Sequence, residues 1–116
     1  MNVFVYANAM EVCFERFLNS VGKTRKTTFF ADLSIAECCD GANGVKDTYK
    51  RVIKAWLNDV EYMSEFVIAL NQKIWQHYEK NRNLAKVYND LWLECDNLCR
   101  EHFKGEELRY YYEYID

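Results

Sequence analysis

The sequence contains no proline, and glycine occurs only four times in its 116 residues. These are the two residue types that most often end or turn regular secondary structure. Few interruptions therefore divide the chain, and its apolar residues recur mainly at steps of three and four, the spacing of one face of an α-helix. The pattern predicts an all-α protein built from long helices.

A chain of this length fits one domain, because domains cluster at roughly 100 to 150 residues. Half of the residues are hydrophobic (50%), which is enough for a core. We expect a single helical domain over residues 1–116, folded as a compact bundle of four or five helices. The helical pattern covers 3–20, then 45–80 with a favoured break near 58–59, then 84–102 and 106–116. Whether 45–80 forms one helix or two is left open by the pattern alone.

The least regular part of the chain follows Gly22, which is predicted to end the first helix. It begins with the basic, hydroxyl-rich "GKTRKTT" and closes with "DGANG" at 40–44, which we interpret as a turn. Ser34 and Glu37 have the spacing of a capping box. This spacing predicts a short helix over 34–39.

The segment "LECDNLCREH" raises the question of a metal site, since Cys95, Cys99 and His102 share one helical face. Zinc requires four converging ligands, and the fourth would have to come from Cys38 or Cys39 through the tertiary fold. The three residues instead continue an apolar stripe, in which cysteine commonly acts as a small buried hydrophobe. We therefore expect core residues here, with no bound metal.

No catalytic constellation is apparent in the sequence. A di-iron bundle needs a glutamate three residues before a histidine, but Ile74 precedes His77 and Cys99 precedes His102 at that offset. The "GKT" at 22–24 lacks the upstream glycine of a phosphate-binding loop, and "DGANGVKD" lacks the oxygen ligands of a calcium loop. We expect no enzymatic activity, no cofactor and no small-molecule substrate.

The five cysteines are odd in number and follow no disulfide framework, and the N-terminal "MNVFVYANAMEV" lacks the basic start of an export signal. Reduced thiols are typical of the cytoplasm. No stretch approaches the roughly 18 consecutive apolar residues of a membrane span. We expect a cytoplasmic protein without membrane association.

Charge is unevenly distributed along the chain. Residues 1–58 carry eight Lys and Arg against six Asp and Glu, a net +2, whereas residues 59–116 carry seven against twelve, a net −5. Within the first half, lysines step by four along one predicted helix face, next to an arginine and downstream of a second basic cluster. The residues are Lys46, Lys50, Arg51 and Lys54, with Lys23, Arg25 and Lys26 upstream. This ridge is typical of a solvated helix face, and it also raises the alternative of a DNA-associated regulator that uses a basic helix at 45–57.

The C-terminal "RYYYEYID" places four tyrosines in a helix of about ten residues. Only one stripe of so short a helix can face the core, so Tyr110 and Tyr114 are predicted to point outward together. Exposed tyrosines are enriched at protein interfaces. The pair therefore indicates either an interface, such as a homodimer contact, or two rings that lean across neighbouring helices.

Five segments distributed over nearly the whole chain carry a resemblance to a known group. They are "FFADLSIAE", "VKDTYKRVIKAW", "LNQKIWQHYEKN", "LAKVYNDLWLE" and "FKGEELRYYYEYID". In these segments the chain resembles small uncharacterised helical proteins carried on conjugative elements and phages of Gram-positive bacteria. The resemblance implies a cytoplasmic bacterial setting, but it brings no activity, cofactor or site residue.

Together these patterns predict a helical protein that binds another macromolecule, most simply a protein partner or a second copy of itself. A regulatory module of a mobile genetic element would fit this description, with DNA binding as the alternative.

Overall fold

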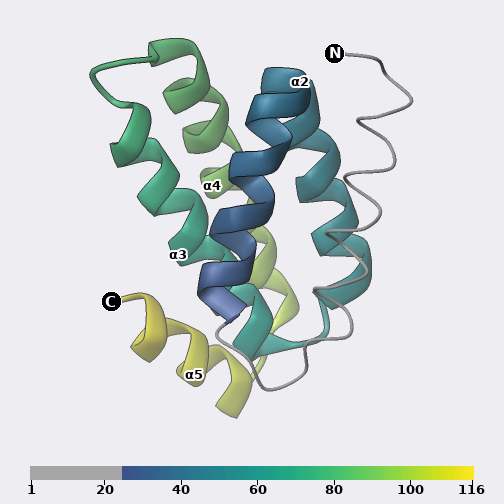
Figure 1. Ribbon diagram of the computed structural model, residues 1–116. Helices are drawn as coiled ribbons and strands as arrows, with labels where there is room; N and C mark the ends of the chain where they lie inside the picture. The colour runs from purple at the N-terminus through teal and green to yellow at the C-terminus, as the bar shows by residue number, and fades with distance from the viewer. Residues whose placement is uncertain (1–24) are drawn as a thin grey trace.

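The structure, a computed structural model, describes residues 25–116, with side chains from Phe29 onward (Figure 1). These residues form helices joined by short turns, and no strand occurs among them. The helices are α2 (Arg25–Trp56), α3 (Val60–His77), α4 (Arg82–His102) and α5 (Glu106–Ile115). The predicted all-α bundle is confirmed. The predicted helix over 3–20 lies outside the described residues.

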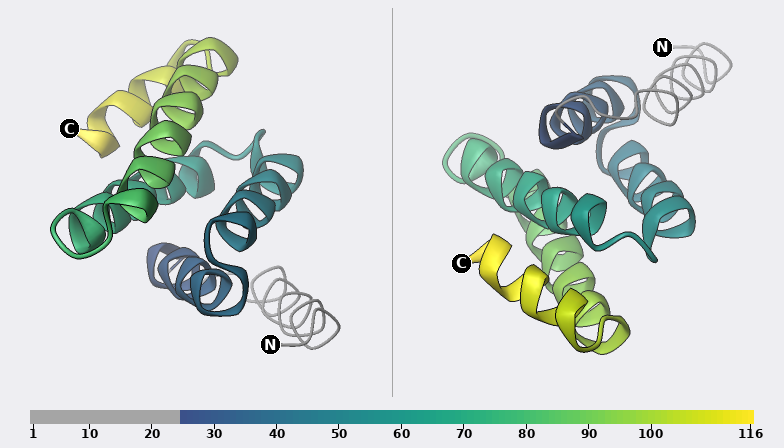
Figure 2. Two further views of the ribbon diagram at one scale, coloured as in Figure 1. Left: turned by 90° about the horizontal axis from the view of Figure 1, so that it is seen from above. Right: turned by 90° about the horizontal axis from the view of Figure 1, so that it is seen from below.

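A sharp reversal divides α2 into two helical arms. Asp40 (φ −149°, ψ 22°) and Gly41 (φ 53°, ψ −135°) leave the helical conformation, and the second arm turns back from the first (Figure 2). Glycine adopts a positive φ without steric penalty, whereas other residues are strained there. The turn predicted over 40–44 is therefore confined to two residues, and helical structure resumes at Ala42.

The first arm of α2 is longer than the sequence indicated. It begins at Arg25, so the prediction of irregular structure was wrong for 25–28, and the helix is not limited to 34–39. Ser34 does not cap a helix, because its hydroxyl donates to the Phe30 carbonyl one turn earlier (2.9 Å). Glu37 reaches other helices instead of its own N-terminus. Tertiary burial stabilises the extra turns through a stripe formed by Phe29, Leu33 and Ala36.

The favoured break near 58–59 is confirmed, because α2 ends at Trp56 and α3 begins at Val60. Asp59 supplies the cap, since its carboxylate accepts a hydrogen bond from the Tyr62 backbone N–H (3.1 Å). The Asn81 side chain caps α4 in the same way. The side chain of the preceding residue, Asn58, points to the end of α4, where its Oδ1 lies 2.8 Å from His102 Nε2.

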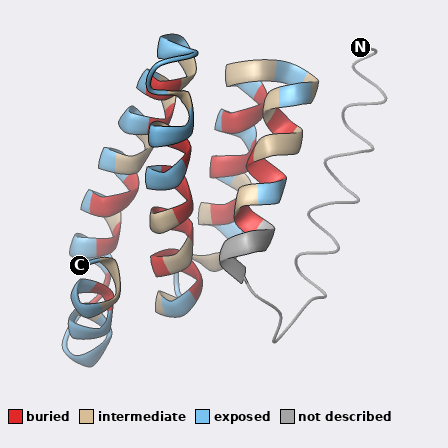
Figure 3. Ribbon diagram, turned by 60° about the vertical axis from the view of Figure 1, so that its left-hand side comes forward, coloured by how far each residue is buried: buried red, intermediate tan, exposed pale blue. Residues whose placement is uncertain are grey.

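α3 is the central helix of the described bundle, because α2, α4 and α5 each pack most extensively against it. Buried residues line the facing sides of the helices (Figure 3). The large side chains at the centre of this core include Phe29, Leu33, Val45, Met63, Phe66, Leu70, Tyr88 and Phe103. No helix within 25–116 has both the length and the apolar character needed to span a membrane.

The predicted core stripe of α4 is largely confirmed. Cys95 and Cys99 are fully buried, as the spacing indicated. His102 was wrongly placed in this stripe, because it is exposed and its Nε2 lies 2.8 Å from Asn58 Oδ1. α4 ends at His102, and the side chain of Phe103 occupies the next core position instead.

A buried tyrosine attaches α5 to α4. The Tyr111 hydroxyl donates to Asp96 Oδ1 (2.6 Å), while Arg100 Nε donates to the other oxygen of the same carboxylate (3.0 Å). Burial and the bond to Asp96 raise the pKa of Tyr111 well above its ordinary value, so the phenol remains a donor. This contact holds the short α5 across the bundle despite its mostly exposed surface.

Candidate functional site

A buried polar network joins the first arm of α2 to α3 and α4. Glu37 Oε1 accepts hydrogen bonds from Lys73 Nζ (3.1 Å), His77 Nε2 (2.9 Å) and the Tyr88 hydroxyl. Lys73, which is fully buried, also donates to Ser34 Oγ (2.6 Å). The His77 and Tyr88 rings are stacked, with their planes only 4° apart. One carboxylate on α2 therefore holds groups from two other helices, α3 and α4.

The electrostatics of the network favour an ionised Glu37. Burial opposes ionisation, but the hydrogen bonds from Tyr88, His77 and Lys73 outweigh it and lower the pKa of Glu37 below its ordinary value of 4.5. Burial, together with the bond to Glu37, raises the pKa of Tyr88 well above the ordinary value. The network is thus a buried ion pair with a neutral phenol as an additional donor.

Ser34 and Lys73 have the separation of a serine nucleophile and its lysine base. Their partners oppose that chemistry. A lysine base must be neutral, whereas Lys73 faces the Glu37 carboxylate, and the Ser34 hydroxyl already donates to the Phe30 carbonyl. The cavities described below are lined by other residues. The arrangement favours a structural role for this network.

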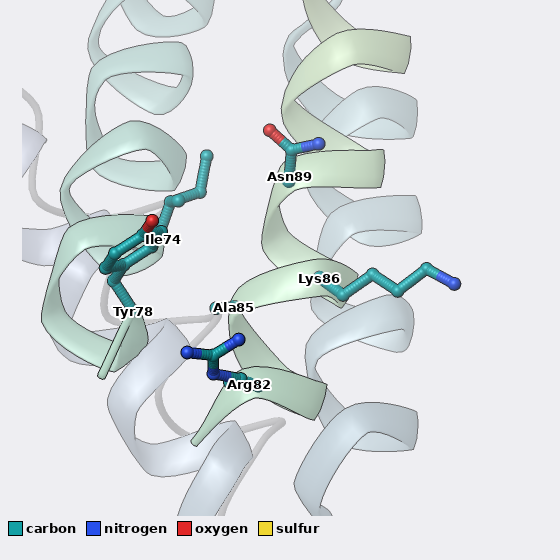
Figure 4. A pocket seen from close by; sticks show the side chains of 6 residues that line it. All are labelled: Ile74, Tyr78, Arg82, Ala85, Lys86 and Asn89. Atoms are coloured by element: carbon teal, nitrogen blue, oxygen red, sulfur yellow. The ribbon is translucent and has the colours of Figure 1, made fainter. Parts of the chain in front are cut away.

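A cationic pocket opens between the end of α3 and the start of α4 (Figure 4). Its volume is about 270 Å³, and its lining residues are Ile74, Tyr78, Arg82, Ala85, Lys86 and Asn89. Most of the lining surface is apolar, and no acidic side chain contributes to it. In Figure 4 the Ile74 and Tyr78 side chains lie at the end of α3 and the Arg82 side chain at the start of α4, while Lys86 extends away from them.

Tyr78 lines this pocket, and a second exposed aromatic side chain, Trp75, lies against Tyr78 outside the lining. Trp75 is 65% exposed and Tyr78 is 55% exposed, and their ring centroids are 5.4 Å apart. They are the two most exposed of the large hydrophobic side chains described. Exposed aromatic residues beside arginine are the composition found at the centres of protein interfaces.

An acidic groove lies at the other end of α3, between its first turn and α5. Its volume is about 420 Å³, and Val60 and Tyr110 form its apolar part. The charged residues that line it are Glu61, Glu106, Glu107, Glu113 and Arg109. With four carboxylates and one guanidinium, the groove has a net charge of −3.

The predicted basic ridge is only partly visible in the described residues. Lys46, Lys50 and Lys54 are all exposed on the second arm of α2, as their spacing indicated, whereas Arg51 is half-buried. The upstream cluster falls at the edge of the described chain. Lys23 lies outside it, and the side chains of Arg25 and Lys26 are not described.

Tyr110 and Tyr114 lie on one side of α5, but only Tyr110 is exposed as predicted, whereas Tyr114 is half-buried. Their rings stack with centroids 5.8 Å apart and planes inclined by 20°. The Tyr114 hydroxyl donates to Glu65 Oε1 on α3 (3.5 Å), so Tyr114 leans across a neighbouring helix. Tyr110 is 37% exposed at the acidic groove. Their role as an intermolecular interface stays a prediction.

The four cysteines in the described part of the chain occupy two different environments. Cys38 is exposed and Cys39 half-buried near the reversal of α2, whereas Cys95 and Cys99 are enclosed in the core. A hydrogen bond with Cys99 and burial raise the pKa of Cys95, which favours an inert thiol. Among residues 25–116, no three His, Cys, Asp or Glu side chains converge as ligands for a metal ion.

Sequence reasoning missed both the polar network and the cationic pocket. One signal was available, because Lys73 continues the buried stripe of Tyr62, Phe66 and Ala69 at helical spacing. A lysine at such a position needs a buried partner. That partner, Glu37, is 36 positions away in sequence, and nothing local identifies it. The pocket residues come from the end of one helix and the start of the next, and they form no motif along the sequence.

The described residues thus define a small helical bundle with two charged surface hollows. No protein-family model matches the chain, and comparisons with curated proteins and with solved structures find no match either. The function therefore has to be inferred from the geometry of these surfaces.

Proposed function

We propose that the protein is a non-catalytic protein-binding module, and that it engages its partner through the cationic pocket together with Trp75. The observation that carries the proposal is an exposed aromatic ring, Tyr78, that lines a largely apolar hollow together with Arg82 and has a second exposed ring, Trp75, next to it. Aromatic and arginine side chains provide most of the binding energy at protein interfaces. The partner surface has acidic groups for Arg82 and Lys86 and an apolar group for the hollow.

The size of the hollow supports a macromolecular ligand. Small-molecule sites are usually about 300–1,000 Å³ and bury most of the ligand. The cationic pocket is smaller, at about 270 Å³, and open to one side. It suits one or two side chains of a partner better than a whole substrate. The nearest titratable network is satisfied internally, which also favours binding over catalysis.

Site-specific photo-crosslinking in the native host tests the proposal. A benzophenone amino acid in place of Tyr78 should give a discrete adduct, and the same group in place of Asp47, exposed on α2, should not. The additional substitution Trp75→Ala should abolish the adduct at position 78. Equal labelling from positions 47 and 78, or no adduct from position 78, would contradict the proposed surface.

DNA binding is the second candidate function, favoured by the exposure of Lys46, Lys50 and Lys54 along one side of α2. Binding through these lysines should weaken steeply with salt, because bound phosphates release counterions. The triple alanine variant should reduce that salt dependence. Absence of binding to duplex DNA even at low salt would eliminate this candidate.

We also propose a bacterial cytoplasmic setting, as part of a conjugative element or phage. The resemblance in the five segments quoted above supports this setting.

A further inference from the structure

The two hollows have opposite charge and lie at opposite ends of one helix. The cationic pocket includes Ile74, near the end of α3, and the acidic groove includes Val60, at its start. At a rise of about 1.5 Å per residue, these positions are roughly 21 Å apart along the helix axis. The two surfaces therefore cannot satisfy each other within one chain.

The charges of the cationic pocket have no compensation within it. Arg82 and Lys86 are four residues apart on α4, where like charges repel each other. No ion pair of either residue occurs within the described part of the chain. An incoming carboxylate would relieve this repulsion, which makes acidic groups the favoured occupants.

The acidic groove has the complementary composition. Glu106 and Glu107 stand in the first turn of α5 and are exposed, and Arg109 is already paired with Glu113 (3.3 Å). Tyr110 adds an exposed aromatic ring beside these carboxylates. A surface with carboxylates around an aromatic side chain matches an apolar hollow bordered by an arginine and a lysine.

We propose that copies of this chain associate head to tail, with the acidic groove of one copy seated on the cationic pocket of the next. The proposal rests on the proposed function, because it identifies the partner of the cationic pocket as a second copy. Such contacts join two different surfaces, so they extend into chains or close into rings instead of stopping at a symmetric dimer.

Sedimentation velocity of the full chain tests this proposal with two complementary variants. Arg82→Glu/Lys86→Glu disables the pocket and leaves the groove intact, whereas Glu61→Gln/Glu106→Gln/Glu107→Gln disables the groove and leaves the pocket intact. Each variant alone should associate at least about tenfold more weakly than the unmodified chain. Mixed together, they should form a 1:1 complex that grows no further, since only one intact pair of surfaces remains.

Salt provides an independent measurement. Raising the ionic strength from about 0.1 M to about 1 M shortens the screening length from roughly 10 Å to roughly 3 Å, so association of the unmodified chain should weaken. Circular dichroism spectra and melting curves of both variants verify that the fold is retained. A glutamate at position 82, in the first turn of α4, is favourable for the helix dipole.

Three results would overturn the proposal. They are a strictly monomeric chain at about 1 mM, association that is unchanged in Arg82→Glu/Lys86→Glu, and a mixture of the variants that stays monomeric. The second result would be expected if copies met symmetrically through the tyrosines of α5. A monomeric chain whose position 78 still crosslinks to another protein in cells would leave the proposed function standing while removing self-association.

Discussion

Replacement of Glu37 by glutamine isolates the contribution of the buried ion pair. The side chain keeps its shape, and its amide oxygen can still accept from Tyr88, but the negative charge opposite Lys73 disappears. Lys73 is fully buried and would retain only uncharged partners, which are the amide oxygen at position 37, the Ser34 hydroxyl at 2.6 Å and the Phe30 ring, whose centroid is 4.2 Å from Nζ. None of these neighbours compensates a full positive charge.

The expected loss of stability follows from these contacts. Removing one partner of a buried ion pair costs about 3–5 kcal/mol, because the other charge is left uncompensated. The loss is also limited by the cost of removing the charge from the lysine. For a lysine of ordinary pKa at pH 7, this deprotonation costs roughly 5 kcal/mol. The free energy of unfolding of a small domain is only about 5–15 kcal/mol. Glu37→Gln should therefore lower the melting temperature by roughly 12–20 °C.

Urea and thermal unfolding, followed by circular dichroism at pH 7, measure this effect. Glu113→Gln is a matched control, because Glu113 forms an exposed ion pair with Arg109 and its loss should change stability by less than about 1 kcal/mol. The double variant Glu37→Gln/Lys73→Met removes both charges and should recover much of the loss. A Glu37→Gln protein within about 0.5 kcal/mol of the unmodified chain would refute the reasoning.

Further predictions concern pH, the α2 reversal and the attachment of α5. Burial raises the pKa of Asp32 from 3.8 to about 7, so its contribution to stability is fully present below pH 3.8 and is lost as pH rises to about 7. In pH-dependent urea unfolding, Asp32→Asn should be more stable than the unmodified chain at pH 8, by up to roughly 4 kcal/mol, with the advantage shrinking toward pH 4. An unchanged pH profile would contradict this assignment. Gly41→Ala should lower the free energy of unfolding by about 1–3 kcal/mol, because the backbone has φ 53°, which strains residues other than glycine. The added methyl group meets no atom within 4 Å, so the loss comes from backbone strain and not from a clash. Urea unfolding showing no loss would mean that the turn relaxes. Tyr111→Phe should cost about 1–3 kcal/mol, because Asp96 loses a buried donor. Tyr112→Phe, at a residue 37% exposed, serves as its control in thermal unfolding and should change little.

The pH dependence of the ion pair has the opposite sign to that of Asp32. The pKa of Glu37 is lowered, so its contribution is present above the ordinary value of 4.5 and is lost as the pH falls through the lower value in the folded protein. Unfolding free energies measured across this pH range can therefore distinguish the two residues. Ionisation of Asp32 changes stability between about pH 4 and 7, whereas protonation of Glu37 changes it in more acidic solution.

The helical content and much of the core were determined by the sequence itself. The absence of proline and the apolar spacing of three and four specify helices locally, and so the break before α3 and the burial of Cys95 and Cys99 could be predicted. The ends of the helices were harder to predict from the sequence. The first arm of α2 extends back to Arg25 because Phe29 and Leu33 are buried by other helices, a stabilisation that no local pattern records.

Only the tertiary structure decided which polar residues meet. Glu37 was interpreted as part of a capping box because its nearest sequence neighbours suggested nothing else, whereas its partners Lys73, His77 and Tyr88 come from two other helices. The cationic pocket likewise arises where two successive helices turn past each other. Helix formation depends on neighbours within about four positions, which a sequence displays directly. Ion pairs and surface hollows depend on how helices pack, and that information exists only once the chain has folded.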